Sequence, residues 1–115
     1  MIVEDNQDGR EGMAILLRME GFQVTSATNG YEALRVAESA RPDLVITDIV
    51  MPGLDGIEMI KSLRRISGFT SLPIVVLTAH GKEKAEDAIK AGATRTMIKP
   101  VVVKEFLALI NNLLS

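Results

Sequence analysis

Short apolar runs alternate with apolar stripes at helical spacing along the whole chain, and this alternation constrains the fold more than any other feature. Five runs are short enough for strands, and they begin at Ile2, Phe22, Leu44, Ile74 and Met97. Apolar residues at helical spacing follow each run, most strongly over residues 103–114. A strand–helix order repeated in this way predicts an α/β fold in which right-handed crossovers join the strands of one parallel sheet.

The character of the runs predicts the order of the strands. Leu44–Ile46 and Ile74–Leu77 are continuously apolar, as expected of strands buried on both faces. Residues 22–27 alternate between apolar and polar side chains, so we expect this strand at an edge of the sheet. An edge position for the second strand fits the order 2-1-3-4-5 of doubly wound, flavodoxin-like (βα)5 folds, with residues 1–115 forming one domain.

In folds of this kind, ligands bind beyond the carboxyl ends of the strands, so the residues after each apolar run form the candidate site. Those residues are Glu4 and Asp5, Asp48, Thr78 and Ala79, and Lys99 and Pro100. If the first and third strands are neighbours, the three carboxylates converge, and each like-charged pair at about 4 Å costs on the order of 4 kcal/mol. Such a cluster requires a cation or large pKa shifts.

The residue types at the strand ends point to a particular chemistry. The chain has no Cys and only one His, His80, so the ligands on offer at the acids are oxygens. Oxygen ligands suit a hard cation that keeps several waters, such as Mg²⁺, with Mn²⁺ also acceptable. A carboxylate beside such an ion can act as a nucleophile at phosphorus. Lys99 would then neutralise charge on the phosphoryl oxygens, and the Thr78 hydroxyl would bond one of them.

Three stretches resemble the receiver domain of two-component response regulators, and the resemblance covers the whole chain. Residues 48–56, DIVMPGLDG, are similar to the phosphoacceptor loop of that family. Residues 73–79, PIVVLTA, and residues 92–100 are similar to its fourth-strand and fifth-strand segments. The resemblance implies that Asp48 accepts a phosphoryl group from a histidine kinase or a histidine phosphotransfer protein, in the cytoplasm.

The same resemblance implies roles for the other residues at the strand ends. Asp5 and Asp48 would bind Mg²⁺ together with the backbone carbonyl of Val50. Glu4 would act mainly through a metal-bound water. Lys99 would pair first with the acceptor carboxylate and then with a phosphoryl oxygen.

A switch is also implied by the resemblance. Thr78 would move toward the phosphoryl group, Ala79 would leave room for that movement, and the Lys99–Pro100 peptide bond would be cis. This chain has Thr96 where the family usually carries an aromatic residue, so the output signal would be carried differently. His80 would border the site and change the lifetime of the phosphoryl bond, although a solvated loop histidine is the plainer interpretation.

Charge and surface pattern limit the partners. The net charge of −2 gives no reason to expect binding to nucleic acid or to an anionic membrane. No apolar stretch approaches the ~20 residues that a membrane span needs. In this family the fourth helix, fifth strand and fifth helix often form an output or dimer surface. Here that surface would present Lys84, Lys90, Arg95 and Lys104.

Three rival interpretations predict different residues. A pseudo-receiver, which binds partners without phosphorylation, would lack the acceptor Asp, the acidic pair or the Lys, and this chain has all of them. A phosphohydrolase of the haloacid-dehalogenase type needs a second Asp where this chain has Val50. A flavodoxin needs a phosphate loop rich in Ser and Thr where Glu4 and Asp5 lie. We therefore expect a signalling phosphoacceptor rather than an enzyme, with at most slow self-phosphorylation and autodephosphorylation.

Overall fold

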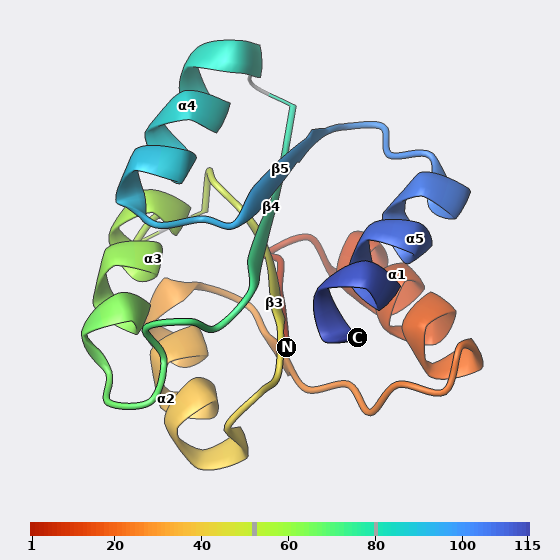
Figure 1. Cartoon of the computed structure of the whole chain (residues 1–115), viewed down its shortest axis with the longest axis horizontal. Helices are drawn as coiled ribbons and strands as arrows, with labels where there is room; N and C mark the ends of the chain where they lie inside the picture. Colours follow the sequence, from red (N-terminus) through yellow and green to blue (C-terminus); the bar gives the residue numbers. More distant parts are fainter. Residues whose placement is uncertain (52, 80) are drawn as a thin grey trace.

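Strands and helices alternate from one end of the chain to the other in the computed structural model, which describes residues 1–51, 53–79 and 81–115 (Figure 1). The strands are β1 (Ile2–Val3), β2 (Ser26–Ala27), β3 (Val45–Asp48), β4 (Ile74–Thr78) and β5 (Arg95–Ile98). The helices are α1 (Gln7–Met19), α2 (Gly30–Ala40), α3 (Gly56–Arg65), α4 (Gly81–Ala91) and α5 (Val103–Leu114).

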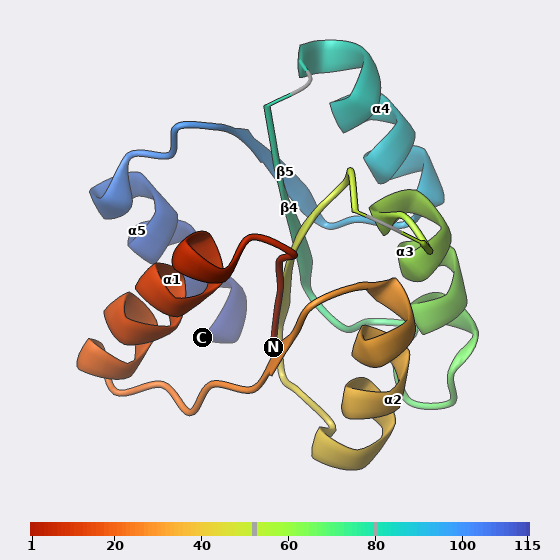
Figure 2. The same ribbon diagram turned by 180° about the vertical axis from the view of Figure 1, so that it is seen from behind.

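The five strands form one parallel sheet in the order β2-β1-β3-β4-β5, which confirms the predicted doubly wound, flavodoxin-like fold. Helices α1 and α5 cover one face of the sheet, and α2, α3 and α4 cover the other (Figures 1 and 2). The order of the sheet reverses between β1 and β3, so their carboxyl ends border the crevice at which this fold binds ligands.

The second strand is shorter than predicted. The sequence pattern predicts a strand over residues 22–27, but only Ser26 and Ala27 join the ladder. The physical reason is the length of β1, which offers just Ile2 and Val3 as partners. Phe22 and Val24 instead pack, half-buried, against the core on the α1 and α5 side.

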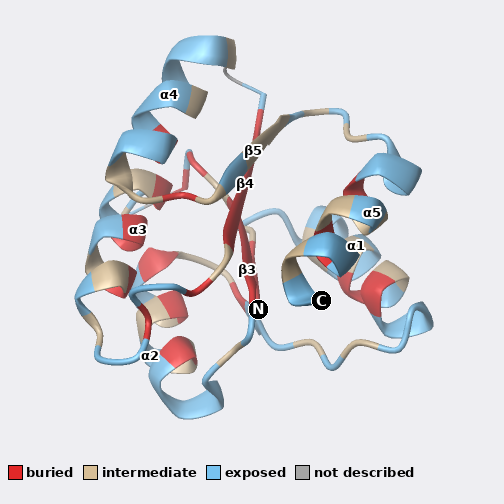
Figure 3. Cartoon of the chain, in the orientation of Figure 1, coloured by how far each residue is buried: buried red, intermediate tan, exposed pale blue. Residues whose placement is uncertain are grey.

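Two apolar cores lie on the two faces of the sheet (Figure 3). Successive residues of β4 point to opposite faces, so Ile74 and Val76 join the core under α2, α3 and α4, while Val75 joins the core under α1 and α5. This double burial explains the continuous apolar run and holds the end of β4 rigidly beside β3. In the described part of the chain, no helix is both long and apolar enough to cross a membrane.

Arg64, near the end of α3, closes the amino-terminal edge of the sheet. Its Nη1 donates to the carbonyls of Phe69 at 2.9 Å and Leu72 at 2.6 Å, in the loop before β4. Its Nε and Nη2 donate to the carbonyl of Gly92 at 3.0 and 2.6 Å, in the turn before β5. One guanidinium therefore ties together the backbone that leads into two neighbouring strands, and burial lowers its pKa.

Candidate functional site

Three carboxylates meet at the carboxyl edge of the sheet, as the strand order requires. Glu4 and Asp5 follow β1, and Asp48 is the last residue of β3, the neighbour of β1. One oxygen from each of these side chains lies within 4.8 Å of the other two. Glu4 and Asp48 are half-buried and Asp5 is exposed, so the cluster opens to solvent on the Asp5 side.

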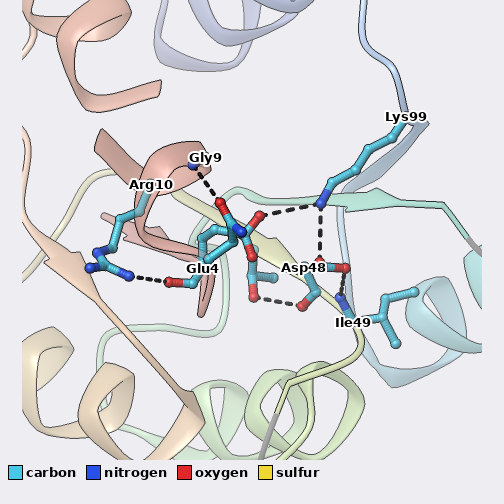
Figure 4. A network of polar contacts seen from close by, with 8 residues as sticks. Glu4, Gly9, Arg10, Asp48, Ile49 and Lys99 are labelled. Atoms are coloured by element: carbon cyan, nitrogen blue, oxygen red, sulfur yellow. Dashed lines mark hydrogen bonds and ion pairs between the residues drawn. The ribbon is translucent and has the colours of Figure 1, made fainter. Parts of the chain in front are cut away.

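Lys99 is the cation that faces this cluster (Figure 4). It follows β5, and its Nζ lies 3.1 Å from Asp48 Oδ2 and 3.3 Å from Glu4 Oε1. Burial by itself lowers the pKa of the Lys99 ammonium, but the hydrogen bonds and charges of Asp48 and Glu4 outweigh burial and raise it. Lys99 is therefore charged at neutral pH and shared between two acids.

The backbone around Asp48 is fixed by short contacts. Its Oδ1 accepts a hydrogen bond from the backbone N–H of Ile49 at 2.7 Å, and its carbonyl accepts one from Thr47 Oγ1 at 2.8 Å. Gly56, the first residue of α3, lies directly against it. A Cβ at Gly56 would overlap the Asp48 carbonyl oxygen and would stand 2.7 Å from Ile49 Cα. Only glycine allows α3 to begin this close to Asp48.

The turn that carries Glu4 and Asp5 is held at both ends. The Glu4 N–H continues the sheet by donating to the Ala27 carbonyl at 3.1 Å. Asn6 then caps α1 by accepting from the Gly9 N–H at 2.8 Å. Arg10 Nη1 donates to the Glu4 carbonyl at 2.9 Å, which closes the turn (Figure 4). Nothing in the sequence marks Arg10 as a site residue, because a side chain that binds a backbone carbonyl leaves no pattern in the sequence.

The other predicted residues that the structure describes lie at the same edge, with one exception. Thr78 is fully buried at the end of β4, and its carbonyl accepts a hydrogen bond from the Lys99 N–H at 2.9 Å. Ala79 is exposed beside it, and Val50 is exposed after β3. The Lys99–Pro100 bond is cis, as the resemblance implied.

Thr96 is the exception among the predicted residues. It pairs with Val76 inside the β4–β5 ladder, two residues before the strand end, so it does not reach the acid cluster. Together with Ala85 and Ile89 it lines a shallow depression beside α4. His80 lies outside the described residues.

The donor set fits a hard divalent cation. Glu4, Asp5 and Asp48 supply only oxygen ligands, and they bring three negative charges to a region where Lys99 supplies one positive charge. Like charges this close repel one another unless a cation lies among them. Carboxylates with an open, solvated side are typical ligands of cations that keep part of their water shell.

A family model described as the response regulator receiver domain matches residues 1–111. Among curated proteins, the transcriptional regulatory protein PrrA of Mycobacterium tuberculosis is 36% identical over 115 residues, covering 99% of this chain and 48% of PrrA. Response regulator MprA of Mycolicibacterium vanbaalenii is 39% identical over 115 residues, covering 99% of this chain and 49% of MprA. The chain thus spans about half the length of these relatives.

Solved structures with the same fold include two receivers. The chemotaxis response regulator CheY4 of Vibrio cholerae superposes with a TM-score of 0.90 at 32% identity, covering 97% of this chain and 94% of CheY4. The receiver domain of a signal transduction histidine kinase from Syntrophus aciditrophicus has a TM-score of 0.90 at 29% identity, covering 98% of this chain and 86% of that one.

Proposed function

The chain belongs to the response regulator receiver domain family, and on that premise we propose that residues 1–115 form a phosphoacceptor domain of a two-component phosphorelay with Asp48 as the acceptor. One observation carries the proposal. Lys99 Nζ bridges Asp48 and Glu4 at 3.1 and 3.3 Å, at the point where three carboxylates converge. A structural ion pair would need one acid, whereas phosphoryl transfer needs an acceptor, further acids and a cation together.

The transfer step uses the carboxylate of Asp48 as nucleophile. One of its oxygens forms a bond to phosphorus while the bond from phosphorus to the donor histidine nitrogen breaks, and the imidazole leaves with the bonding electrons. Lys99 already touches Asp48 Oδ2, so its ammonium stands beside the oxygens on which charge develops. The donor would be the phosphohistidine of a histidine kinase or of a histidine phosphotransfer protein.

Asp5, Asp48 and the Val50 carbonyl would hold Mg²⁺, and Glu4 would act mainly through one of its waters. When bound, the ion supplies positive charge that offsets the carboxylates and the phosphoryl oxygens. Mn²⁺ would satisfy the same oxygen ligands. Glu4 contacts Lys99 directly, so it also helps to aim the ammonium at Asp48.

The conformational change that follows phosphorylation would begin at the end of β4. Thr78 would turn toward the phosphoryl group, with Ala79 leaving space for it and Pro100 shaping the loop that carries Lys99. Thr96 fills the place of the usual inward-turning aromatic ring, so a coupled ring movement is not available to this chain. His80 would set the lifetime of the phosphoryl group.

Partner binding would follow the same switch. The face formed by α4, β5 and α5 is the candidate homodimer or output surface, and it presents the exposed side chains of Lys84, Lys90, Arg95 and Lys104. The domain would act as a signalling phosphoacceptor and not as a turnover enzyme. A pseudo-receiver role is disfavoured, because the acids and Lys99 are present and in contact.

Intact mass spectrometry after incubation with acetyl phosphate tests the proposal. With Mg²⁺ present, the wild type is expected to gain one phosphoryl group. Asp48→Asn is expected to gain none, and Lys99→Met is expected to gain it far more slowly. A wild type that stays unmodified with Mg²⁺ bound would favour the pseudo-receiver and would redirect attention to partners of the unphosphorylated surface.

A further inference from the structure

Arg10 occupies a place in the site that the proposed chemistry does not explain. It lies in the first turns of α1, and its Nη1 donates to the carbonyl of Glu4 at 2.9 Å. Glu4 and Asp5 are the two acids of the β1–α1 turn. The bond spans six residues and joins the helix directly to the backbone that carries both acids (Figure 4).

Asp5 depends on this bond more than its neighbours do. Glu4 is held by Lys99 Nζ at 3.3 Å and by the sheet through its N–H, and Asp48 is the last residue of a strand. Asp5 is exposed, so we infer that its position depends on the backbone on either side of it. Before Asp5 that backbone ends in the Glu4 carbonyl, which Arg10 binds, and after Asp5 it enters α1 through the Asn6 cap.

The charge of Arg10 acts in the opposite direction. The Arg10 guanidinium is bonded to the backbone that carries two of the acids and adds positive charge there, so charge alone would make Arg10 weaken the binding of a divalent cation. The guanidinium is planar and presents its donors in a fixed fork, so the bond to Glu4 constrains orientation as well as distance. Groups behind the ligands of a metal ion hold those ligands in the orientation that binds the ion. Removing such a group lowers the metal affinity, because the ligands lose that order.

We propose that Arg10 is a positioning residue for the divalent cation: by binding the Glu4 carbonyl it holds Asp5 where it can ligate the ion, and this effect outweighs its charge. The inference deepens the proposed phosphoacceptor function and rests on it for the identity of the cation. It concerns the affinity of the site for Mg²⁺ and not the transfer step itself, so Arg10 needs no contact with the phosphoryl group.

The experiment measures Mg²⁺ binding by titration calorimetry without a phosphodonor, at a temperature well below unfolding. Arg10→Met is expected to weaken Mg²⁺ binding by about tenfold, as the loss of groups behind metal ligands does. Arg10→Lys keeps the charge but loses the fork, and its affinity is expected between those of Arg10→Met and the wild type. Phosphoryl uptake by Arg10→Met is expected to approach the wild-type rate at saturating Mg²⁺.

Arg18→Met is the matched control. It removes the same charge from the same helix, about 12 Å further along the axis at 1.5 Å per residue. That separation exceeds the Debye length of about 8 Å at physiological ionic strength. Arg18 is exposed in the last turn of α1, so its loss is expected to change Mg²⁺ affinity by less than about twofold.

The outcomes separate this inference from the proposed function. If Arg10→Met binds Mg²⁺ as tightly as the wild type, or more tightly, Arg10 is not a positioning residue, even if Asp48 is phosphorylated normally. A lower melting temperature with unchanged Mg²⁺ affinity would also overturn the inference, because it would show a purely structural role. If the tenfold difference is present but the wild type takes no phosphoryl group, the role of Arg10 stands and the proposed function fails.

Discussion

Lys99 and Arg64 are two half-buried cations at opposite edges of the same sheet, and they have different kinds of partner. Lys99 contacts the carboxylates of Asp48 and Glu4, and these acids raise its pKa against the effect of burial. Arg64 donates to the carbonyls of Phe69, Leu72 and Gly92, and burial lowers its pKa. Lys99 offsets repulsion between carboxylates at the carboxyl edge, whereas Arg64 satisfies backbone carbonyls at the amino edge.

The difference separates function from stability within one small domain. The partners of Lys99 are carboxylates. Under the proposed function a metal ion would compete with Lys99 for these carboxylates, and a phosphoryl group would take their place beside its ammonium. The partners of Arg64 are backbone carbonyls of two loops. A bound ligand would not replace the hydrogen bonds that Arg64 donates to them. We infer that the carboxyl edge holds repulsion that binding relieves, whereas the amino edge contributes stability continuously. Helix α3 joins the two, since it begins at Gly56 beside Asp48 and ends near Arg64.

The largest expected effect comes from the amino edge. Arg64→Met leaves three carbonyls without their charged donor, and hydrogen bonds to charged groups contribute about 1.5–3 kcal/mol each. Arg64 is only half-buried, so solvent would replace part of the lost bonds, and we expect the free energy of unfolding to fall by about 3 kcal/mol in urea titrations. Arg65→Met, at the exposed neighbouring position, is expected to change it by less than about 0.5 kcal/mol.

This pair tests the comparison directly. An Arg64→Met variant as stable as Arg65→Met would show that the carbonyls find water instead, and the amino edge would lose its special role. The increase in stability that Mg²⁺ gives is expected to be the same in Arg64→Met and the wild type, because the two edges share no partner.

A smaller effect is expected where α3 meets the carboxyl edge. In Gly56→Ala the new methyl group overlaps the Asp48 carbonyl oxygen, so backbone must move and the free energy of unfolding is expected to fall by about 2 kcal/mol. Phosphoryl uptake is expected to slow as well, because the movement displaces Asp48. Urea titration and intact mass measure the two effects.

Gly12→Ala is the control for the glycine substitution. Gly12 lies inside α1 with open space around it, so alanine is expected to raise helix stability by about 0.5–1 kcal/mol. If the two substitutions change the free energy of unfolding equally, Gly56 does not need to be glycine for steric reasons, and α3 could begin further from Asp48.

The sequence predicts the carboxyl edge better than the amino edge, for a physical reason. Buried strands leave continuous apolar runs, and the parallel order then places Glu4, Asp48 and Lys99 at one edge without any knowledge of side-chain positions. The edge position of β2 followed from its mixed pattern. Its length did not, because the length depends on the two residues that β1 offers as partners.

Contacts between side chains and distant carbonyls left no such signal. Arg64 donates to the carbonyl of Gly92, 28 residues away. Every residue type has a backbone carbonyl, so the identity of residue 92 does not predict this bond. Arg10 is likewise an ordinary helix residue until the turn before it closes. Neither hydrophobic periodicity nor residue type predicts these bonds. Only the structure shows which side chains hold the backbone in place.

The smallest expected effect tests whether the carboxyl edge holds repulsion. Asp5→Asn removes one charge from the cluster. Because Asp5 is exposed, the repulsion between it and a second carboxylate is the value in water, roughly 1 kcal/mol at about 4 Å, and not the larger value of a half-buried pair. Without metal, the variant is therefore expected to be more stable than the wild type by about 1 kcal/mol at low ionic strength. Mg²⁺ is expected to stabilise the wild type by mass action but not Asp5→Asn, so the order of the two stabilities reverses as Mg²⁺ is added.

Asp8→Asn separates this effect from a general response to charge. Asp8 lies in the first turn of α1, where a negative charge favours the helix by about 0.3–1 kcal/mol, so the same change of charge is expected to lower stability there. The Mg²⁺ response of Asp8→Asn is expected to match that of the wild type. If Asp5→Asn is instead the less stable protein without metal, Lys99 and Arg10 already compensate the three acids. The carboxyl edge would then contribute stability as the amino edge does, and the contrast between the two cations would be one of geometry alone.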